Sequence, residues 1–319
     1  MGGNRRAVVV GAGIAGLSCA VRLRERGWSV RVLADAPVEA STSHLAAAVW
    51  FPTRAGPRDK LLDWGRRTFT ELARQAADGV PGVVMRESLT LYRTEPEPQW
   101  WADAVGGARP ARPGELPPGY AHGLRFAVPL VEMPVHLPWL AAEAGRRGIV
   151  LERRRVSSLD EAGRDADLVV HCSGMGARTL VGDTAVTPVR GQIVRVTNPG
   201  LTMSVRDEAH PGGRAYVHPR AHDCVLGGTL DDGVWDATPD PAAGEAILRR
   251  CRDIVPALGD AEVLEHLAGL RPARPEVRLE AEPATATRPR VIHDYGHGGS
   301  GITLSWGCAG DVADLADAP

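Results

Sequence analysis

Residues 7–16, Ala-Val-Val-Val-Gly-Ala-Gly-Ile-Ala-Gly, decide the fold predicted for this sequence. Four apolar residues directly before a Gly-x-Gly-x-x-Gly motif are typical of a buried strand. Residues 17–26 have helical character, Gly27 is placed to end that helix, and a second strand is expected over residues 29–33 with Asp35 just beyond it. Strand, glycine motif, helix, strand and acid in this order form the full dinucleotide-binding fingerprint.

Each position of the fingerprint has a physical task in binding a dinucleotide. Gly11 permits the turn, Gly13 lets a pyrophosphate approach the backbone, and Gly16 lets the helix pack against the strand. The carboxylate of Asp35 can accept hydrogen bonds from ribose hydroxyls of the adenosine half. The motif fits NAD and FAD equally, so the nature of the cofactor depends on the rest of the chain.

The composition is that of a globular protein without a nucleic-acid footprint. The 319 residues are 44% hydrophobic and 24% charged, and the net charge of −2 lacks the basic excess that a nucleic-acid surface needs. No apolar run approaches the roughly 18 residues of a membrane span, and residues 1–6 lead into too short an apolar run for a signal peptide. We therefore expect a soluble, cytoplasmic protein with neither nucleic acid nor membrane as a partner. The cysteines lie far apart and form no Cys-x-x-Cys pair, so a disulfide framework and structural zinc are not expected: Cys19, Cys172, Cys224, Cys251 and Cys308.

Two further segments contain small residues that let the backbone approach a flat ligand. Residues 41–52 read Ser-Thr-Ser-His-Leu-Ala-Ala-Ala-Val-Trp-Phe-Pro; the hydroxyls either cap a helix or donate to phosphate, and the alanines leave room for a second flat ring. Residues 291–304 indicate a strand, a loop with four glycines in six residues, and a helix that begins near Ile302. Its free N–H groups would face a ligand that becomes negative in reaction, such as a reduced flavin; a plain strand-to-helix turn is the alternative.

The remaining chain alternates helix-like and strand-like segments. The patterns predict helices over residues 54–82, 137–147 and 242–254, and strands over residues 83–92, 149–156, 165–174, 192–196, 215–218 and 224–229. Turn signals separate the last three strands, which favours an antiparallel sheet.

These patterns together predict an α/β fold. A Rossmann-like cofactor-binding domain with a parallel sheet is interleaved with a second, α+β substrate domain built on a mainly antiparallel sheet. The cofactor domain is predicted to comprise residues 1–54, 132–190 and 284–319, and the substrate domain residues 55–131 and 191–283. The active site is expected where the two meet.

Three blocks of the sequence carry a resemblance to a known family. They are residues 8–18, which contain the fingerprint, residues 269–275, Gly-Leu-Arg-Pro-Ala-Arg-Pro, and residues 291–301, Val-Ile-His-Asp-Tyr-Gly-His-Gly-Gly-Ser-Gly. Together they resemble the D-amino-acid oxidase family, which includes D-aspartate oxidase. The resemblance implies non-covalent FAD, a two-domain fold and oxidation of a D-amino acid to an imino acid. Oxygen then reoxidises the flavin to give hydrogen peroxide, and water converts the imine to a 2-oxo acid and ammonia.

The resemblance also implies roles for three residues that meet the substrate. Arg271 falls on the carboxylate-binding arginine, and a guanidinium matches a carboxylate with two parallel hydrogen bonds. Tyr216 falls on a tyrosine whose hydroxyl assists that carboxylate, and Gly299 falls where a backbone carbonyl holds the substrate amine. Hydride moves from Cα to flavin N5, so catalysis depends on positioning and electrostatics without a side-chain base.

The expected FAD site combines the fingerprint, the small residues after it and the C-terminal glycine loop. The amides of Gly301, Ile302 and Thr303 and the Thr303 hydroxyl are expected to stabilise charge on the reduced ring. The full set of expected cofactor-binding residues is Gly11, Gly13, Ile14, Ala15, Gly16, Asp35, Ala36, Ser41, Thr42, Ser43, Ala47, Ala48, Val49, Val156, Ser173, Gly174, Arg271, Gly298, Gly299, Gly301, Ile302 and Thr303.

The resemblance places Val49 and Phe51 on the walls of the substrate pocket, and Phe51 favours neutral, hydrophobic side chains. Arg206 lies in a segment resembling the one where D-aspartate oxidases carry a side-chain-binding arginine. The second arginine of that pocket is missing, because Leu230 follows Thr229, and His218 adds polarity. We therefore expect a neutral D-amino acid, with D-aspartate or D-glutamate as the alternative.

Other classes of function stay open at this stage. Glycine or N-methyl amino acids are a further substrate alternative, an NAD-dependent dehydrogenase would share only the first fingerprint, and a non-enzymatic flavin-binding protein would be expected to lack Arg271 or Tyr216. Oxygen is the expected second substrate, and a homodimer is one option for the assembly. His293 and His297 straddle a glycine loop, so we expect no metal site there.

Overall fold

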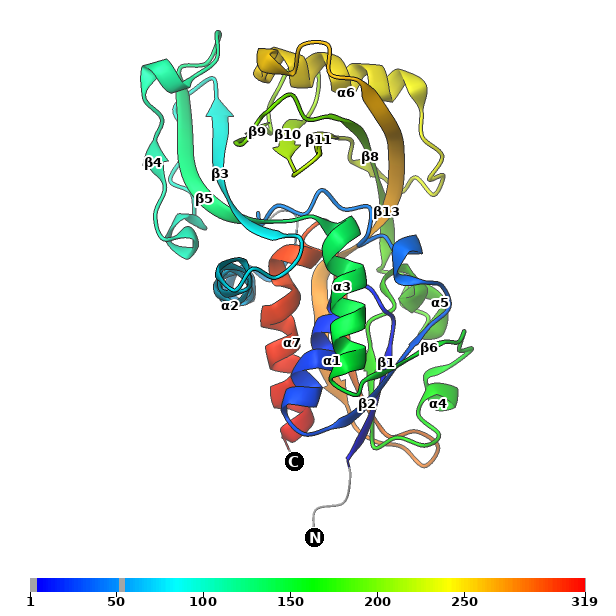
Figure 1. Ribbon diagram of the computed structural model, residues 1–319. Helices are drawn as coiled ribbons and strands as arrows, with labels where there is room; N and C mark the ends of the chain where they lie inside the picture. The colour runs from blue at the N-terminus through cyan, green and yellow to red at the C-terminus, as the bar shows by residue number, and fades with distance from the viewer. Residues whose placement is uncertain (1–4, 52–54, 319) are drawn as a thin grey trace.

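The computed structural model describes residues 5–51 and 55–318. Within these residues one 14-stranded mixed sheet runs through the whole molecule, and helices pack on its faces (Figure 1). The expected helix start at residue 54 and the domain boundary at the same position lie outside the described residues.

The parallel part of the sheet confirms the fingerprint prediction. It is built from β14 (Arg290–His297), β7 (Leu168–His171), β1 (Arg6–Val10), β2 (Ser29–Ala34) and β6 (Val150–Arg153), in that order. Each neighbouring pair in this order is parallel. The short apolar runs of β14, β7 and β1 therefore form strands that are buried on both faces.

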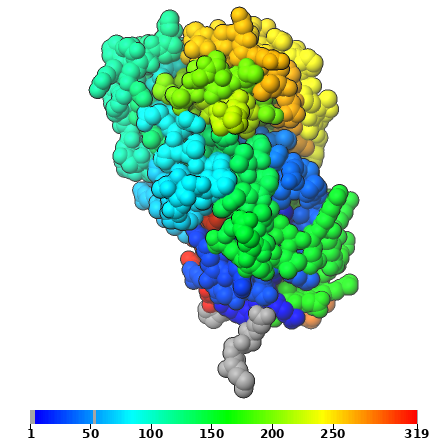
Figure 2. All heavy atoms as spheres, in the orientation of Figure 1, coloured from blue at the N-terminus to red at the C-terminus, as the bar shows by residue number. Residues whose placement is uncertain are grey.

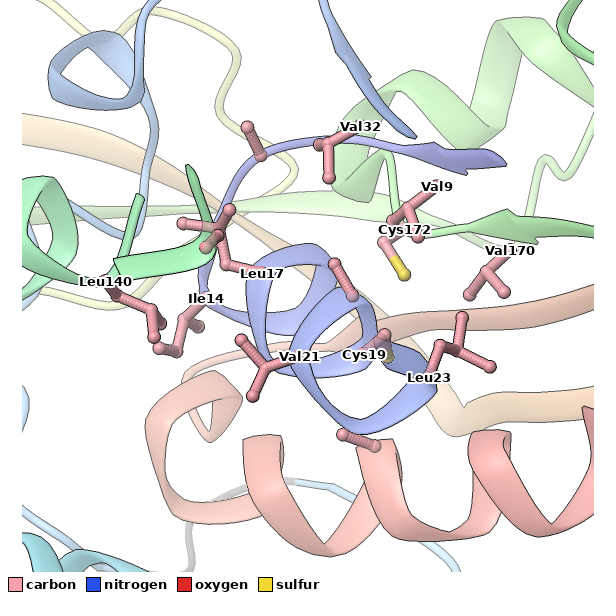
Figure 3. Packing of buried hydrophobic residues seen from close by; sticks show 14 of the residues in the cluster. Val9, Ile14, Leu17, Cys19, Val21, Leu23, Val32, Leu140, Val170 and Cys172 are labelled. Atoms are coloured by element: carbon pink, nitrogen blue, oxygen red, sulfur yellow. The ribbon is translucent and has the colours of Figure 1, made fainter. Parts of the chain in front are cut away.

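Alternate residues of β1 explain why both faces are covered. Ala7 and Val9 pack into a core with α1 (Ile14–Glu25), α3 (Met133–Arg146) and α7 (Gly301–Asp317), part of which is seen in Figure 3. Val8 and Val10 point to the opposite face, where they pack with α4 (Leu159–Ala162). The first and last helices lie side by side, as the blue and red ribbons of Figure 1 show, and blue and red atoms lie next to each other at the lower end in Figure 2.

Gly16 is required by the packing of α1 on the strand before it. A Cβ atom at Gly16 would lie 1.9 Å from the Gly11 carbonyl oxygen and 3.4 Å from Val9 Cγ1. No side chain fits at such a distance, so the third glycine of the motif lets the helix approach the strand, as the sequence predicts.

The second part of the sheet is mainly antiparallel, as predicted. Its order is β4 (Arg109–Pro110), β5 (His122–Val131), β3 (Val83–Tyr92), β9 (Ser204–Asp207), β10 (Ala215–Pro219), β11 (Asp223–Gly227), β8 (Thr187–Thr197) and β13 (Val263–Glu282), with β12 (Asp231–Asp232) beside β8. Only β3 and β9 pair in parallel. The helix α6 (Pro241–Ile254) covers one face of this part, and α2 (Arg58–Ala77) packs against α7.

The strand β13 joins the two parts of the sheet. Its first half pairs with β8 up to Ala273, and its second half pairs with β14 from Arg278 to Glu282, with a register shift between the two halves. Two prolines, Pro272 and Pro275, lie near this change of partner, where fewer ladder hydrogen bonds are needed from the backbone. Arg271 therefore lies in extended backbone, as the proline after it predicts.

The segment after β2 does not form an α-helix. A short 3-10 helix, η1 (Val38–Ala40), is followed by turns and by a single bridge from Val49 to Leu130. The Ser41 hydroxyl donates to the Val38 carbonyl at 2.6 Å, and Thr42 Oγ1 donates to the Leu270 carbonyl at 3.2 Å. The Thr42 hydroxyl thus ties this loop to β13, the Ser41 hydroxyl bonds within the loop, and the capped-helix alternative is wrong.

The cysteines are all free and buried in the structure. Burial is the main cause that raises the pKa of the Cys251 thiol to about 12, and it raises the pKa of Cys19 and Cys308 well above the usual value. Among residues 5–51 and 55–318 there is also no helix with the length and apolar character needed to cross a bilayer.

Candidate active site

One large cavity lies at the carboxyl ends of the parallel strands, next to the antiparallel part of the sheet. Its volume is about 720 Å³, and it extends from the glycine motif after β1 to the first turn of α7. Ligands of open α/β sheets bind at this edge, and the volume is within the range of cofactor sites.

One end of the cavity is formed by the first turn of α1. The Ile14 amide donates to Ser43 Oγ at 3.1 Å, so the Ser43 proton remains available for a ligand. A Cβ atom at Gly13 would lie 3.0 Å from the same oxygen, which shows how closely the loop carrying Ser43 covers the helix start. Asp35 lies exposed directly after β2 and also lines the cavity.

The other end of the cavity is formed by the glycine loop and the start of α7. The first hydrogen bond of this helix runs from the Leu304 amide to the Ser300 carbonyl, 3.0 Å. The amides of Gly301, Ile302 and Thr303 precede it and line the cavity, so they are placed to donate to a ligand.

The Thr303 hydroxyl has a different role from the one expected. Thr303 Oγ1 donates to the Phe51 carbonyl at 3.0 Å and accepts from the Phe51 amide at 3.1 Å. Its only proton is therefore engaged with the backbone. The hydroxyl fixes Phe51 against α7, and the donor that Thr303 offers to the cavity is its amide.

Period-two alternation puts the predicted substrate residues on one wall of the cavity. Val205, Ala215 and Val217 pack toward α6, while their neighbours Arg206, Tyr216 and His218 line the cavity. On β8, Val194 and Val196 pack toward α6, and Val189, Gly191 and Ile193 line the cavity. One face of this sheet is thus a core surface and the other is a binding surface.

Arg271 and Tyr216 lie together at this wall. Arg271 Nη1 donates to the Thr229 carbonyl at 3.1 Å. Burial lowers the pKa of the guanidinium, while the neighbouring Tyr216 hydroxyl acts in the opposite direction. Burial raises the pKa of the Tyr216 hydroxyl, so the phenol stays protonated and can donate to an anion.

The glycine loop is tied to the strand that carries Arg271. The Gly298 amide donates to the Pro272 carbonyl at 2.9 Å, directly after Arg271 in the chain. Gly298 has a φ of 56°, a conformation that favours glycine. This hydrogen bond fixes the glycine loop against the backbone of the strand next to Arg271.

Arg206 is buried at the side of the same wall. Its side chain is 3% exposed, its guanidinium carbon lies 3.9 Å from the centre of the Phe51 ring, and its Nε and Nη2 have no hydrogen-bond partner among the described residues. Burial lowers its pKa to about 10. The His218 ring stacks on Tyr216 with centres 4.7 Å apart, and burial followed by the charge of Arg206 lowers the pKa of His218 well below its usual value, so it is neutral.

The structure brings together all of the predicted site residues in one cavity lining except Gly16, whose role is packing. The sequence reasoning missed several others because nothing in their local pattern marks them. Glu208 and Arg214 form an ion pair of 2.7 Å in the segment between β9 and β10, and Arg155 and Gly191 also line the cavity.

Two buried clusters of side chains near the cavity consist of residue types that can bind a metal ion. Cys19 and Cys172 lie close to Asp294, and His297 and Cys308 lie close to the same carboxylate. His297 Nε2 is 3.1 Å from Asp294 Oδ1, so these two side chains contact each other directly. The absence of a metal remains a prediction of the sequence.

The lining fits an FAD molecule on its own geometry. Two helix N-termini, those of α1 and α7, face one continuous cavity and supply two positively polarised ends. The close approach at Gly13 suits a pyrophosphate, and at Gly301 a built Cβ would meet only Ile14 Cγ2, at 3.9 Å, which leaves room for a flat ring.

Comparison with known proteins agrees with this fit. The family model described as FAD dependent oxidoreductase (DAO) matches residues 6–315, and the chain belongs to this family. The protein is an FAD-dependent enzyme of the D-amino-acid oxidase type.

The individual relatives cover almost the whole chain. The sequence is 55% identical over 314 residues to a D-amino-acid oxidase of Rubrobacter xylanophilus, with 98% of this chain and 96% of the relative covered. It is 44% identical over 315 residues to a D-amino-acid oxidase of Streptomyces coelicolor, with 97% and 96% covered. The crystal structure of glycine oxidase from Bacillus cereus has a TM-score of 0.81 at 22% identity, with 98% and 94% covered, and this supports the fold alone.

Proposed function

We propose that this protein oxidises D-amino acids to 2-oxo acids, with release of ammonia and hydrogen peroxide. The observation that carries the proposal is the pair of Arg271 and Tyr216, which present a guanidinium and a protonated phenol to a cavity that fits FAD. A carboxylate bound there would be oriented by two kinds of donor. The D-amino-acid oxidases that share 55% and 44% identity with the chain support the same reaction.

In the proposed reaction the residues bind, orient and exclude water. Arg271 and Tyr216 hold the carboxylate, and the Gly299 carbonyl accepts from the amine, so the Cα–H bond takes one fixed direction. When bound in this cavity, FAD would supply the hydride acceptor and the redox chemistry that links the substrate to oxygen. The amides of Gly301, Ile302 and Thr303 face the region where negative charge develops.

The division into domains and the assembly are part of the proposal. The cofactor domain comprises residues 1–54, 132–190 and 284–319, and the substrate domain residues 55–131 and 191–283. The wall that carries Arg206 and Tyr216 then belongs to the substrate domain, and the glycine loop belongs to the cofactor domain. We further propose a cytoplasmic protein, with a homodimer as one option for its assembly.

A neutral substrate side chain is favoured by the apolar part of the lining. Val49, Phe51, Ile193 and Leu230 supply aliphatic and aromatic surface to the cavity. Burial of a branched side chain against such surface contributes roughly 1.5–3 kcal/mol of binding free energy. Substrates such as D-valine and D-methionine are the expected group.

An acidic substrate is the second candidate, and Arg206 is the observation that favours it. This buried guanidinium leaves two nitrogens without partners among the described residues. Arg206, Arg214 and Arg271 line the cavity; Glu208 pairs with Arg214, and the charge of Asp231 acts on Arg271. The excess positive charge suits a ligand with two carboxylates, such as D-aspartate, since a buried unpaired charge is unfavourable.

The substitution Arg206→Met separates the two candidates. Kinetics with D-valine and D-aspartate should show D-valine turnover within about threefold of the original, because methionine keeps apolar volume. Any D-aspartate turnover should fall by roughly 100-fold, because a charge-assisted contact is lost. Arg66→Met, on the exposed face of α2, is the control. Equal losses for both substrates would mean that Arg206 supports the pocket and does not select side chains.

The proposed function is tested by the visible spectrum of the purified protein. Anaerobic addition of D-valine, D-methionine or D-aspartate should bleach the flavin bands, and air should restore them with formation of peroxide. The corresponding L-amino acids should leave the spectrum unchanged. Bleaching by glycine or N-methylglycine alone would assign the other substrate class, and a flavin that no amino acid bleaches would refute the roles of Arg271 and Tyr216.

A further inference from the structure

The guanidinium of Arg271 lies against the backbone of Gly191, which has no side chain. A Cβ atom at Gly191 would lie 1.9 Å from Arg271 Nη1 and 2.2 Å from both Cζ and Nη2. Nonbonded carbon and nitrogen atoms stay well over 3 Å apart, so any residue other than glycine would displace the guanidinium. We propose that Gly191 is a positioning residue that fixes Arg271 for carboxylate binding, which rests on the oxidase function proposed above.

The strand register explains why this position is decisive. Arg271 on β13 is paired with Val189 on β8. Gly191 is two residues further along β8 and therefore faces the same side of the sheet, where both residues line the cavity. The long arginine side chain extends diagonally across the strand pair to lie over Gly191, a distance that such diagonal neighbours bridge readily.

A hydrogen-bonded clamp holds the guanidinium in this place. The Thr229 carbonyl accepts from Arg271 Nη1 at 3.1 Å. Thr229 is itself held against β8, because its hydroxyl accepts from the Gln192 amide at 3.0 Å and donates to Asp231 at 2.9 Å. The side chain is thus confined between the Gly191 backbone and one fixed carbonyl, and the entropy of ordering it has been lost before the substrate binds.

Glycine is needed at position 191 for space and not for backbone conformation. The glycines with positive φ are found elsewhere in the structure, and Gly191 is an ordinary strand residue paired with Gly269. Alanine can adopt such a conformation without strain. The three atoms closest to the added Cβ all belong to Arg271, so the clash with this side chain is the obstacle.

A similar arrangement is found under Tyr216. Gly227 on β11 lies directly opposite Tyr216 on β10, and a Cβ atom at Gly227 would lie 2.1 Å from Tyr216 Cζ and 2.2 Å from its hydroxyl oxygen. Both side chains that would meet the carboxylate therefore lie flat on glycine backbone. Glycines therefore make room for both side chains of this binding wall, Gly191 for Arg271 and Gly227 for Tyr216. This agreement supports the positioning role of Gly191.

The proposal is tested by a double-mutant cycle with Gly191→Ala, Arg271→Ala and the double variant. The measurements are the flavin content, the Tm and the Kd of 3-methylbutanoate, a carboxylate without an amine, followed by the change in the flavin spectrum. Gly191→Ala should weaken 3-methylbutanoate binding and raise the KM for D-valine, each by roughly 10- to 100-fold, as expected when a charge-assisted contact is misplaced. In the Arg271→Ala background the same substitution should change neither the Kd nor the Tm, because the atoms that clash are absent.

The control is Gly269→Ala, directly opposite Gly191, where a built Cβ would meet only Leu45 Cδ1 at 3.4 Å and Thr42 Cγ2 at 4.0 Å. It should keep the Kd of 3-methylbutanoate within about threefold, since contacts of this length are ordinary. If Gly191→Ala does not fold, recovery of flavin content and Tm in the double variant supports the proposal, and failure to recover overturns it. Equal effects of Gly191→Ala with and without Arg271 would also overturn it. An original enzyme that binds 3-methylbutanoate but turns over no D-amino acid would refute the oxidase proposal while leaving this cycle interpretable.

Discussion

Arg271→Ala is expected to lower kcat/KM for D-amino acids by at least about 100-fold, or about 3 kcal/mol of transition-state stabilisation. The guanidinium is partly buried, its pKa is lowered by burial, and it lines the cavity beside Tyr216. Its removal leaves a substrate carboxylate without its charged partner in a desolvated site, and the direction of Cα is no longer fixed. Steady-state kinetics at equal flavin content measure the effect.

Arg274→Ala is the matched control for this prediction. Arg274 lies three residues further along β13, but its guanidinium contacts Asp183 at 3.1 Å and lies outside the cavity lining. Its removal should change kcat/KM by less than about threefold, because neither member of this ion pair lines the cavity. Arg271→Lys should recover part of the loss, because lysine keeps the charge without the two-pronged geometry. Similar losses in the Arg271 and Arg274 variants would refute a specific role in carboxylate binding.

Gly16→Ala is expected to abolish FAD binding and to lower the free energy of unfolding by roughly 3 kcal/mol. The added Cβ would lie 1.9 Å from the Gly11 carbonyl oxygen, which belongs to the rigid turn after β1. The helix α1 would have to move away from the strand, and its first-turn amides would leave the cavity. Flavin content after purification and the Tm measure the two effects.

Gly145→Ala in α3 tests whether the effect comes from this clash. A Cβ atom at Gly145 meets no atom within 4 Å, so the substitution should be neutral or raise stability by up to about 1 kcal/mol. Full flavin content in Gly16→Ala would contradict the packing role of the third glycine. A loss in both variants would point to a general sensitivity of the helices.

The sequence predicts those parts of the fold whose chemistry is local. The strand, glycine motif and helix of residues 6–25 were predicted because a tight turn, a phosphate approach and a helix contact each demand a particular residue. The start of α7 was found for the same reason, since a glycine loop before an apolar helix has a local signature. The alternating strands near residues 192, 215 and 224 follow from a sheet with one covered face.

Features that depend on register or on distant partners could not be predicted in this way. The role of Gly191 depends on Arg271, 80 positions later in the chain, lying diagonally across a strand pair. The Thr303 hydroxyl was expected to face the cofactor, but a backbone segment 252 residues away takes its proton. The 20-residue strand β13 contains two prolines, a residue type that usually marks the end of a strand. They are tolerated here because β13 changes its pairing partner from β8 to β14 near these positions.

The place of β14 in the sheet has a consequence for how the protein is made. This strand is formed by residues 290–297, yet it lies between β13 and β7, and α7 after it packs on α1. While the chain is still being synthesised, β7 and β13 both present open edges, and the fingerprint near the N-terminus has no partner for its outer helix face. Because α7 begins at Gly301, productive capture of FAD therefore has to wait until more than 300 residues have left the ribosome. The nascent chain remains exposed to aggregation throughout that interval, and abundant free FAD at the moment of completion should raise the yield of active protein.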